Sequence, residues 1–187
     1  MGANKQLLAL GGEPLVRRTV RQVLAADFGA VLVVLGRDAG EVRGALAGLA
    51  ASFTVNPRFG EGLATSFRAG LDALSPDVAA AAFVLADMPL VTSEMYRAVQ
   101  DTYRSSGAPL VLTRFGGVRA PPHLFHRSLF ARFGDAGDHG PRDLVREYQG
   151  EAAWLDFPAW ALTDVDTPAD LARARALAAR LDAGRKG

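Results

Sequence analysis

The sequence predicts an α/β fold in which a mostly parallel sheet carries helices on both of its faces. Short, continuously apolar runs, such as residues 30–36 and 80–86, alternate along the chain with apolar residues at helical spacing. Such runs are typical of strands buried on both faces. Alternating strands and helices indicate βαβ units, which imply a parallel sheet. The chain of 187 residues has no linker and no internal repeat, so we expect a single domain over residues 1–187.

Apolar spacing and boundary signals then predict the individual elements in order. The predicted strands cover residues 30–36, 52–56, 80–86, 108–114 and 152–157. The predicted helices cover residues 13–27, 41–50, 62–74, 93–104, 126–133, 141–149 and 167–181. Pro14 suits the first turn of the first helix, and Thr167 with Pro168 forms a strong start signal for the last one.

Composition and charge exclude several classes of function. The net charge is +1, and the sequence has no basic block, so we do not expect a nucleic-acid partner. No apolar run approaches the roughly 20 residues that span a bilayer, and we see no secretory signal. The absence of cysteine excludes disulfides and thiolate chemistry. His123, His126 and His139 show no metal-ligand spacing, so we expect them in surface positions or loops, in a cytoplasmic protein.

Asp87 stands alone at the tip of the apolar strand 80–86 and is the first candidate for function. Aspartate is common in turns, and a turn is one interpretation of this residue. Ligands of open α/β sheets, however, bind beyond the carboxyl ends of the strands, where loops carry function. A functional Asp87 requires a second carboxylate or a phosphate beside it.

Asp166 is the candidate for that second carboxylate. It precedes the helix over residues 167–181, where a negative charge is favourable by roughly 0.3–1 kcal/mol without any ligand. Alternatively, Asp87 and Asp166 from separate strand ends hold Mg²⁺, which prefers one or two carboxylates together with phosphate oxygens and water.

Two further segments contain weaker candidates. Gly62 leads into a helix with Thr65 and Ser66 in its first turn, a pattern that suits an anion or a nucleobase edge but also an ordinary turn. Gly2 and Lys5 lie in a loop before the first helix, where a lysine is either a point charge for phosphates or a solvated terminal residue.

Taken together and in order, these segments resemble the MobA-like NTP transferase family, which includes the molybdopterin guanylyl- and cytidylyltransferases. The resembling pieces are MGANKQLLALGGEPLV at 1–16, GEGLATSFRAGL at 60–71, VLADMPLVT at 84–92, GDHGPRDLV at 137–145 and DVDTPADL at 164–171. They extend over nearly the whole chain. The GDHGPR and DVDTPADL segments look most like the cytidylyltransferase branch.

The resemblance implies a Rossmann-like, three-layer αβα fold of the nucleotide-diphospho-sugar-transferase type. It also implies transfer of a nucleoside monophosphate from an NTP to a phosphorylated acceptor such as molybdopterin, with release of pyrophosphate. The resemblance to the cytidylyltransferase branch implies that the NTP is CTP. Asp87 matches the metal-binding aspartate of the family and Asp166 a second contact to Mg²⁺. Lys5 matches the lysine on the triphosphate, with Gly2 in the same nucleotide-binding loop. The resemblance also assigns nucleotide binding to Gly62, Thr65 and Ser66.

Two departures from the family pattern leave other interpretations open. The family normally begins with a strand and a glycine-rich loop ending in Arg-Met-Gly, whereas this sequence starts at Met-Gly, so we expect an N-terminally truncated domain. In the acceptor segment, with Arg119 and Pro122, the residues before the proline are Ala120 and Pro121 rather than Gly and His or Asn. One alternative acceptor is therefore another phosphorylated metabolite. A second alternative is a non-catalytic nucleotide-binding protein that assists a molybdoenzyme.

Overall fold

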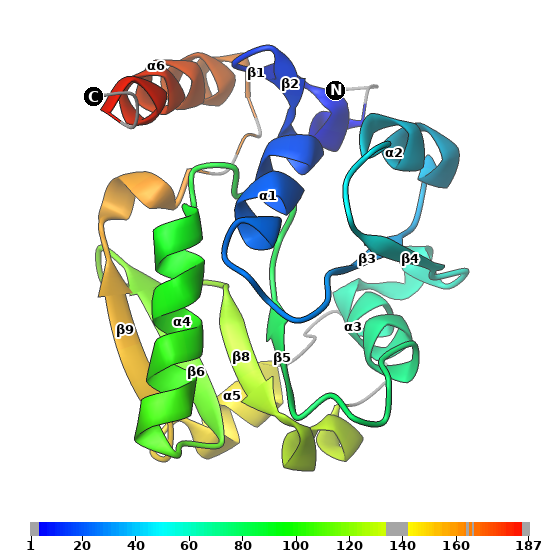
Figure 1. Cartoon of the computed structure of the whole chain (residues 1–187), viewed down its shortest axis with the longest axis vertical. Helices are drawn as coiled ribbons and strands as arrows, with labels where there is room; N and C mark the ends of the chain where they lie inside the picture. The colour runs from blue at the N-terminus through cyan, green and yellow to red at the C-terminus, as the bar shows by residue number, and fades with distance from the viewer. Residues whose placement is uncertain (1–3, 134–141, 164, 166, 185–187) are drawn as a thin grey trace.

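The largest sheet of the computed structural model, which describes residues 4–133, 142–163, 165 and 167–184, has five strands (Figure 1). Its strands run in the order β5-β8-β6-β7, and β9 also pairs with β6. Their bounds are Ala80–Phe83 for β5, His123–His126 for β8, Leu110–Phe115 for β6, Val118–Arg119 for β7 and Ala153–Phe157 for β9. The larger sheet therefore consists mainly of strands from the second half of the chain.

Two smaller sheets come from the first half. Strands β3 (Leu32–Leu35) and β4 (Ser52–Val55) pair in parallel, and β1 (Ala9–Leu10) forms a short antiparallel hairpin with β2 (Glu13–Pro14). The expected strands 30–36 and 52–56 thus pair with each other, whereas the sequence pattern does not predict the hairpin.

The predicted α/β class is confirmed, but the sheet is mixed rather than mostly parallel. Strand β6 pairs in parallel with β9, whereas β8 pairs antiparallel with both β5 and β6. Strand β8 is the reason, because it was not predicted and inserts in antiparallel orientation between β5 and β6. It has only four residues and directly follows Pro121 and Pro122, so its signal resembles that of an irregular segment.

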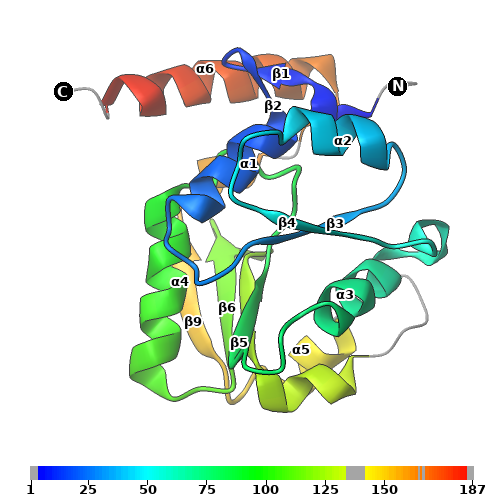
Figure 2. The ribbon, with the colours of Figure 1, turned by 45° about the vertical axis from the view of Figure 1, so that its right-hand side comes forward.

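Helices cover both faces of the larger sheet, as a three-layer αβα arrangement requires (Figures 1 and 2). Helix α4 (Ser93–Ser106) covers one face, where Val99 packs with Val111 and Leu124. Helices α3 (Leu63–Asp72) and α5 (Arg142–Tyr148) cover the other, where Phe67 and Leu144 share a core with alternate residues of β6. Successive β6 side chains point to opposite faces of the sheet, so this one strand contributes residues to the apolar clusters on both faces.

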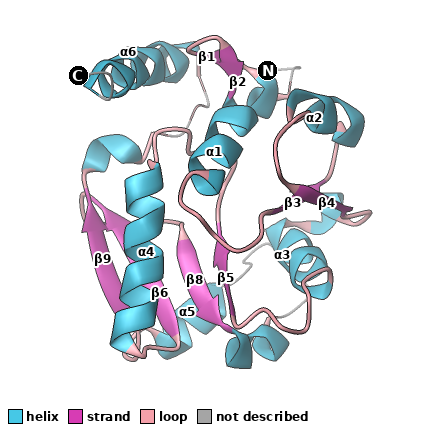
Figure 3. Ribbon diagram, in the orientation of Figure 1, coloured by secondary structure: helices cyan, strands magenta, loops and turns pink. Residues whose placement is uncertain are grey.

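The remaining helices lie beyond the upper end of the larger sheet (Figure 3). These are α1 (Leu15–Leu24), α2 (Ala39–Ala45) and α6 (Pro168–Gly184). Short 3₁₀ turns occur at Lys5–Leu7 (η1), Phe59–Glu61 (η2), Arg127–Arg132 (η3) and Ala159–Ala161 (η4). The helix expected over residues 126–133 is therefore a 3₁₀ turn. No helix in the described part of the chain has the length and apolarity to cross a bilayer.

One apolar cluster joins the chain start to segments from the middle and the end of the sequence. It contains Leu10, Leu15, Leu90 and Val165, all essentially inaccessible, together with alanines of α6. This cluster fixes the first turns of the chain against the segment that follows β5. Polar residues on either side of it are thereby brought to the carboxyl end of β5.

Candidate functional site

Lys5 and Asp87 meet beyond the carboxyl end of β5. The Lys5 Nζ lies 2.9 Å from the Asp87 Oδ2, and the two side chains are 39% and 24% exposed. Lys5 begins η1, whose preceding residue, Asn4, accepts a hydrogen bond from the Gln6 amide through its side chain. The chain start is thus held over the tip of β5, and the ion pair is open to a ligand from solvent.

A second contact connects the chain start to the neighbouring sheet. The Asn4 Nδ2 donates to the Asp38 Oδ2 at 3.2 Å, just beyond the end of β3. Asp38 has a left-handed backbone, with φ of 58°, and directly precedes α2. The sequence gives little signal for either residue, because Asn and Asp both occur commonly in turns. The contact places another carboxylate on the same rim as Lys5.

The N-terminus of α3 contains a buried network of polar side chains centred on Asn56. The Asn56 Nδ2 donates to the Thr65 Oγ1 at 2.9 Å and to the Ser66 Oγ at 3.0 Å, and Asn56 is 2% exposed. The Thr65 hydroxyl also donates to the carbonyls of Arg58 and Gly62. The structure therefore brings together the expected residues Gly62, Thr65 and Ser66.

Asn56 itself is not among the predicted residues, although it is the centre of this network. Its signal in the sequence is the Asn-Pro pair that ends strand 52–56, which indicates only a turn. Gly62 has φ of 108°, a backbone conformation that strongly favours glycine. The Thr65 side chain is buried and directed into the network, whereas Ser66 is partly exposed. Of the two hydroxyls, that of Ser66 is therefore the more accessible to a ligand.

The expected acceptor segment lies at the same end of the larger sheet. Strand register pairs His123 with Phe83, so the preceding Pro122 lies at the carboxyl end of β5, from which Asp87 follows. Pro122 is buried, and its carbonyl accepts from the Thr113 Oγ1 at 3.0 Å. Arg119 is exposed on β7, next to the carboxyl end of β6. Arg119 is thus the more accessible of the two expected acceptor residues.

His123 is not in a surface loop, contrary to the expectation from the sequence. It begins β8, is 6% exposed, and accepts a hydrogen bond from the Thr113 amide through its Nδ1 at 3.3 Å. Burial lowers the pKa of His123 to about 4, with a hydrogen bond to the Pro122 backbone opposing the shift and the charge of Arg119 adding to it. The ring is therefore neutral at physiological pH and acts as an acceptor within the sheet.

The surroundings of Asp87 leave its carboxylate accessible to a divalent ion of the kind that the resemblance implies. Lys5 contacts the Oδ2 of Asp87, and the carboxylate is partly open to solvent. The described residues contain no group of three or more acidic or histidine side chains able to enclose a metal. Mg²⁺ needs only one or two carboxylates when phosphate oxygens and water complete its shell, so Asp87 fits such an ion. Asp166 and Gly2 lie outside the described residues.

Comparison with solved structures shows the same fold in several proteins. Rv0371c from Mycobacterium tuberculosis H37Rv is 26% identical with a TM-score of 0.82, over 94% of this chain and 90% of that one. A structure of Rv0371c in complex with manganese is 25% identical with a TM-score of 0.77, over 94% and 93%. A nucleotidyl transferase from Methanothermobacter thermautotroptrophicus has a TM-score of 0.82 at 21% identity, over 96% and 87%, and supports the fold alone.

Among curated proteins, the chain is similar to 2-C-methyl-D-erythritol 4-phosphate cytidylyltransferase from Streptomyces coelicolor. The two are 38% identical over 117 residues, which make up 59% of this chain and 43% of the relative. The chain therefore matches less than half the length of that relative. Residues 1–153 match the MobA-like NTP transferase domain. With this match over most of its length, the chain belongs to the MobA-like NTP transferase family.

Proposed function

We propose that this protein is a Mg²⁺-dependent nucleotidyltransferase that moves a nucleoside monophosphate from an NTP, CTP in particular, to a phosphorylated acceptor. The observation that carries the proposal is the pairing of Lys5 with Asp87 beyond the carboxyl end of β5. The site holds a cation and a metal-binding type of side chain at the rim where α/β sheets bind ligands. Membership of the family supports the same chemistry.

The reaction needs no nucleophile from the protein. An oxygen of the acceptor phosphate attacks the α-phosphorus and forms the new P–O bond. The bond from the α-phosphorus to the bridging oxygen breaks, and pyrophosphate leaves with that electron pair. The protein contributes in-line positioning and neutralisation of charge, which dominate catalysis of phosphoryl and nucleotidyl transfer.

Lys5, Asp87 and Ser66 each have a role in this scheme. Lys5 supplies a point charge to the triphosphate once it is released from Asp87, and Asp87, with Asp166, would hold the metal ion. When bound, Mg²⁺ stabilises the negative charge that develops on the leaving pyrophosphate. Ser66, positioned by Asn56, lies at the N-terminus of α3 with a hydroxyl available to the nucleotide.

Two acceptors are candidates within the proposal. Molybdopterin is the acceptor in the branch that the GDHGPR and DVDTPADL segments resemble. The similarity to 2-C-methyl-D-erythritol 4-phosphate cytidylyltransferase favours a phosphorylated polyol as the second candidate. Both expose a phosphate monoester, so the chemical step is the same for either.

The test is release of pyrophosphate from CTP and from GTP, each with molybdopterin, with 2-C-methyl-D-erythritol 4-phosphate and with no acceptor. We expect acceptor-dependent release that requires Mg²⁺ and is faster with CTP. Nucleotide binding without release from any pair would contradict the proposal and favour a non-catalytic accessory role, including assistance to a molybdoenzyme.

A further inference from the structure

Helix α1 directs three buried polar side chains toward residues 86–93, the segment that contains Asp87. Arg18, Thr19 and Gln22 are 3%, 3% and 4% exposed, although a helix needs only apolar residues to bury a face. A buried polar group is costly unless it is hydrogen-bonded, so three of them on one short helix require an explanation. Their partners supply it.

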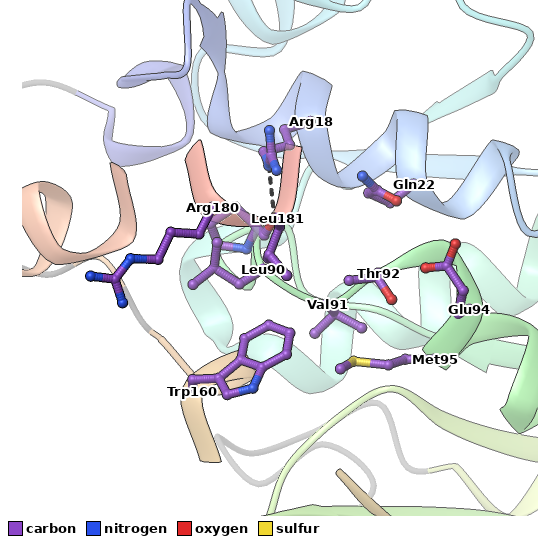
Figure 4. A pocket seen from close by; sticks show the side chains of 11 residues that line it. Arg18, Gln22, Leu90, Val91, Thr92, Glu94, Met95, Trp160, Arg180 and Leu181 are labelled. Carbon is purple, nitrogen blue, oxygen red and sulfur yellow. Dashed lines mark hydrogen bonds between the residues drawn. The ribbon is translucent and has the colours of Figure 1, made fainter. Parts of the chain in front are cut away.

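All three side chains bind the backbone of the Asp87 segment. The Thr19 Oγ1 donates to the Ala86 carbonyl at 3.2 Å, immediately before Asp87. The Arg18 Nε donates to the Pro89 carbonyl at 3.2 Å, two residues after it (Figure 4).

Gln22 provides the third contact of this set. Its Oε1 accepts from the Ser93 amide at 3.0 Å, at the start of α4. The three contacts therefore bracket Asp87 from both sides along the chain.

The side chains of Met88, Leu90 and Val91 pack in the apolar core, but the backbone of the segment is held less firmly by its own hydrogen bonds. Its internal backbone hydrogen bonds are long, at 3.3 Å from the Met88 amide to the Leu85 carbonyl and 3.4 Å from the Val91 amide to the Met88 carbonyl. Residues 89–92 also line a cavity of about 460 Å³, closed on another side by Trp160 and by Arg180 and Leu181 of α6 (Figure 4). Apolar packing holds the segment as a whole, whereas the three contacts from α1 fix its backbone groups on either side of Asp87.

We propose that Arg18, Thr19 and Gln22 are positioning residues that hold the Asp87 carboxylate in place for the metal and the triphosphate. This inference rests on the proposed function, because it assigns the three residues a role in that reaction. In this role they act through the backbone on either side of Asp87. Outer partners of this kind typically change metal affinity or activity by about 10- to 100-fold when removed.

Thr19 allows the sharpest test because two substitutions separate its hydroxyl from its shape. Thr19→Val keeps the volume and removes the donor to Ala86, whereas Thr19→Ser keeps the donor. Binding of Mn²⁺ in the presence of CTP is measured from the electron paramagnetic resonance signal of the free ion. We expect affinity about 10- to 100-fold weaker in Thr19→Val and close to that of the wild type in Thr19→Ser.

Arg17 provides a matched control on the same helix. Its Nη1 donates to the carbonyls of Ala45 and Ala47, both at 2.9 Å, and so binds the C-terminal end of α2 rather than the backbone of the Asp87 segment. Arg18→Met is compared with Arg17→Met, so that each variant loses a guanidinium bound to backbone. We expect weaker Mn²⁺ binding in Arg18→Met alone. This pair also tests the inference if Thr19→Val fails to fold.

Hydrogen exchange gives a readout that is independent of the proposed function. Amides of residues 87–93 are expected to exchange faster in Thr19→Val and Arg18→Met, and unchanged in Arg17→Met. Folded Thr19→Val and Arg18→Met proteins with wild-type exchange and Mn²⁺ affinity would overturn the inference. Failure of the wild-type protein to bind Mn²⁺ with CTP would instead contradict the proposed function, and hydrogen exchange would still decide whether α1 holds the segment.

Discussion

The ammonium group of Lys5 lies 2.9 Å from the carboxylate of Asp87, so an N-terminal residue is paired with the segment after β5. In this arrangement each charge is neutralised by the other, and both remain partly open to solvent. A triphosphate with its metal ion presents charges complementary to both groups. The pair is therefore suited to exchange one partner for another when nucleotide binds.

Replacement of Lys5 by methionine tests that exchange. We expect a loss of kcat/KM for pyrophosphate release of roughly 100-fold, comparable to removal of one charge-stabilising donor from an active site. The free energy of unfolding should change little, because exposed ion pairs contribute about 0–1 kcal/mol. Steady-state kinetics and urea unfolding measure the two effects. Wild-type activity together with a clear loss of stability would contradict a role of Lys5 in the reaction.

Replacement of Asn56 by alanine should loosen the N-terminus of α3. The change leaves the hydroxyls of Thr65 and Ser66 without their donor, at a cost of about 1–3 kcal/mol in the free energy of unfolding. Ser52→Ala is the control, because Ser52 begins β4, the strand that Asn56 follows, and its exposed hydroxyl donates to the Val31 carbonyl. Urea unfolding compares the variants, and equal stabilities would show that the network is unimportant.

Tyr96 offers a test of packing beside the Asp87 segment, because it shares an apolar cluster with Met88 and Val91. Its hydroxyl is fully buried, has no hydrogen-bond partner among the described residues, and burial raises the pKa of Tyr96 above its usual value. Tyr96→Phe should therefore leave stability unchanged or increase it by about 1 kcal/mol. Tyr148→Phe is the comparison, since the Tyr148 hydroxyl accepts from Arg132 at 2.8 Å. Clear destabilisation by Tyr96→Phe, measured by thermal unfolding, would show that the Tyr96 hydroxyl does have a hydrogen-bond partner.

Burial of His123 predicts a pH dependence of stability. The pKa of His123 is about 4 in the folded protein and 6.5 ordinarily, so the unfolded chain binds more protons between these values. Stability should therefore rise with pH from about 4 to 6.5 and be lost as pH falls through that window. The contribution of this residue is on the order of 3 kcal/mol.

The contribution is isolated by comparing the wild type with His123→Asn, whose amide keeps an acceptor for the Thr113 amide. Carboxylates titrate in part of the same window in both proteins, so only the difference between their unfolding free energies reports His123. A difference that does not vary between pH 4 and pH 6.5 would contradict a buried neutral ring.

The fold was predictable from the sequence where apolar pattern and local geometry agree. The strands expected over residues 52–56 and 80–86 form as β4 and β5, although β5 ends at Phe83, three residues before the apolar run does. Strand β8 was missed because two prolines precede four residues, which is too short for a clear period. His123 was misassigned for the same reason, since its burial depends on pairing with strands distant in the sequence.

The site was predictable to a similar degree. Asp87 was singled out by its position after an apolar run, and the resemblance to a family added Lys5, but their contact appears only after the chain folds. Arg18, Thr19 and Gln22 were not predicted, because polar residues in an amphipathic helix ordinarily indicate its solvent face. Their partners are backbone carbonyls and an amide some 70 positions away, which leave no trace in the side-chain pattern.

The role of Asp87 is tested most directly by Mg²⁺-dependent pyrophosphate release from CTP with Asp87→Asn, beside Asp101→Asn as control. Asp101 is an exposed aspartate of α4 that pairs only loosely with Arg104, at 3.5 Å. We predict that Asp87→Asn abolishes acceptor-dependent release while Asp101→Asn retains the wild-type rate, with both variants folded. Wild-type release by folded Asp87→Asn would contradict the assignment of Asp87 to the metal and the nucleotide.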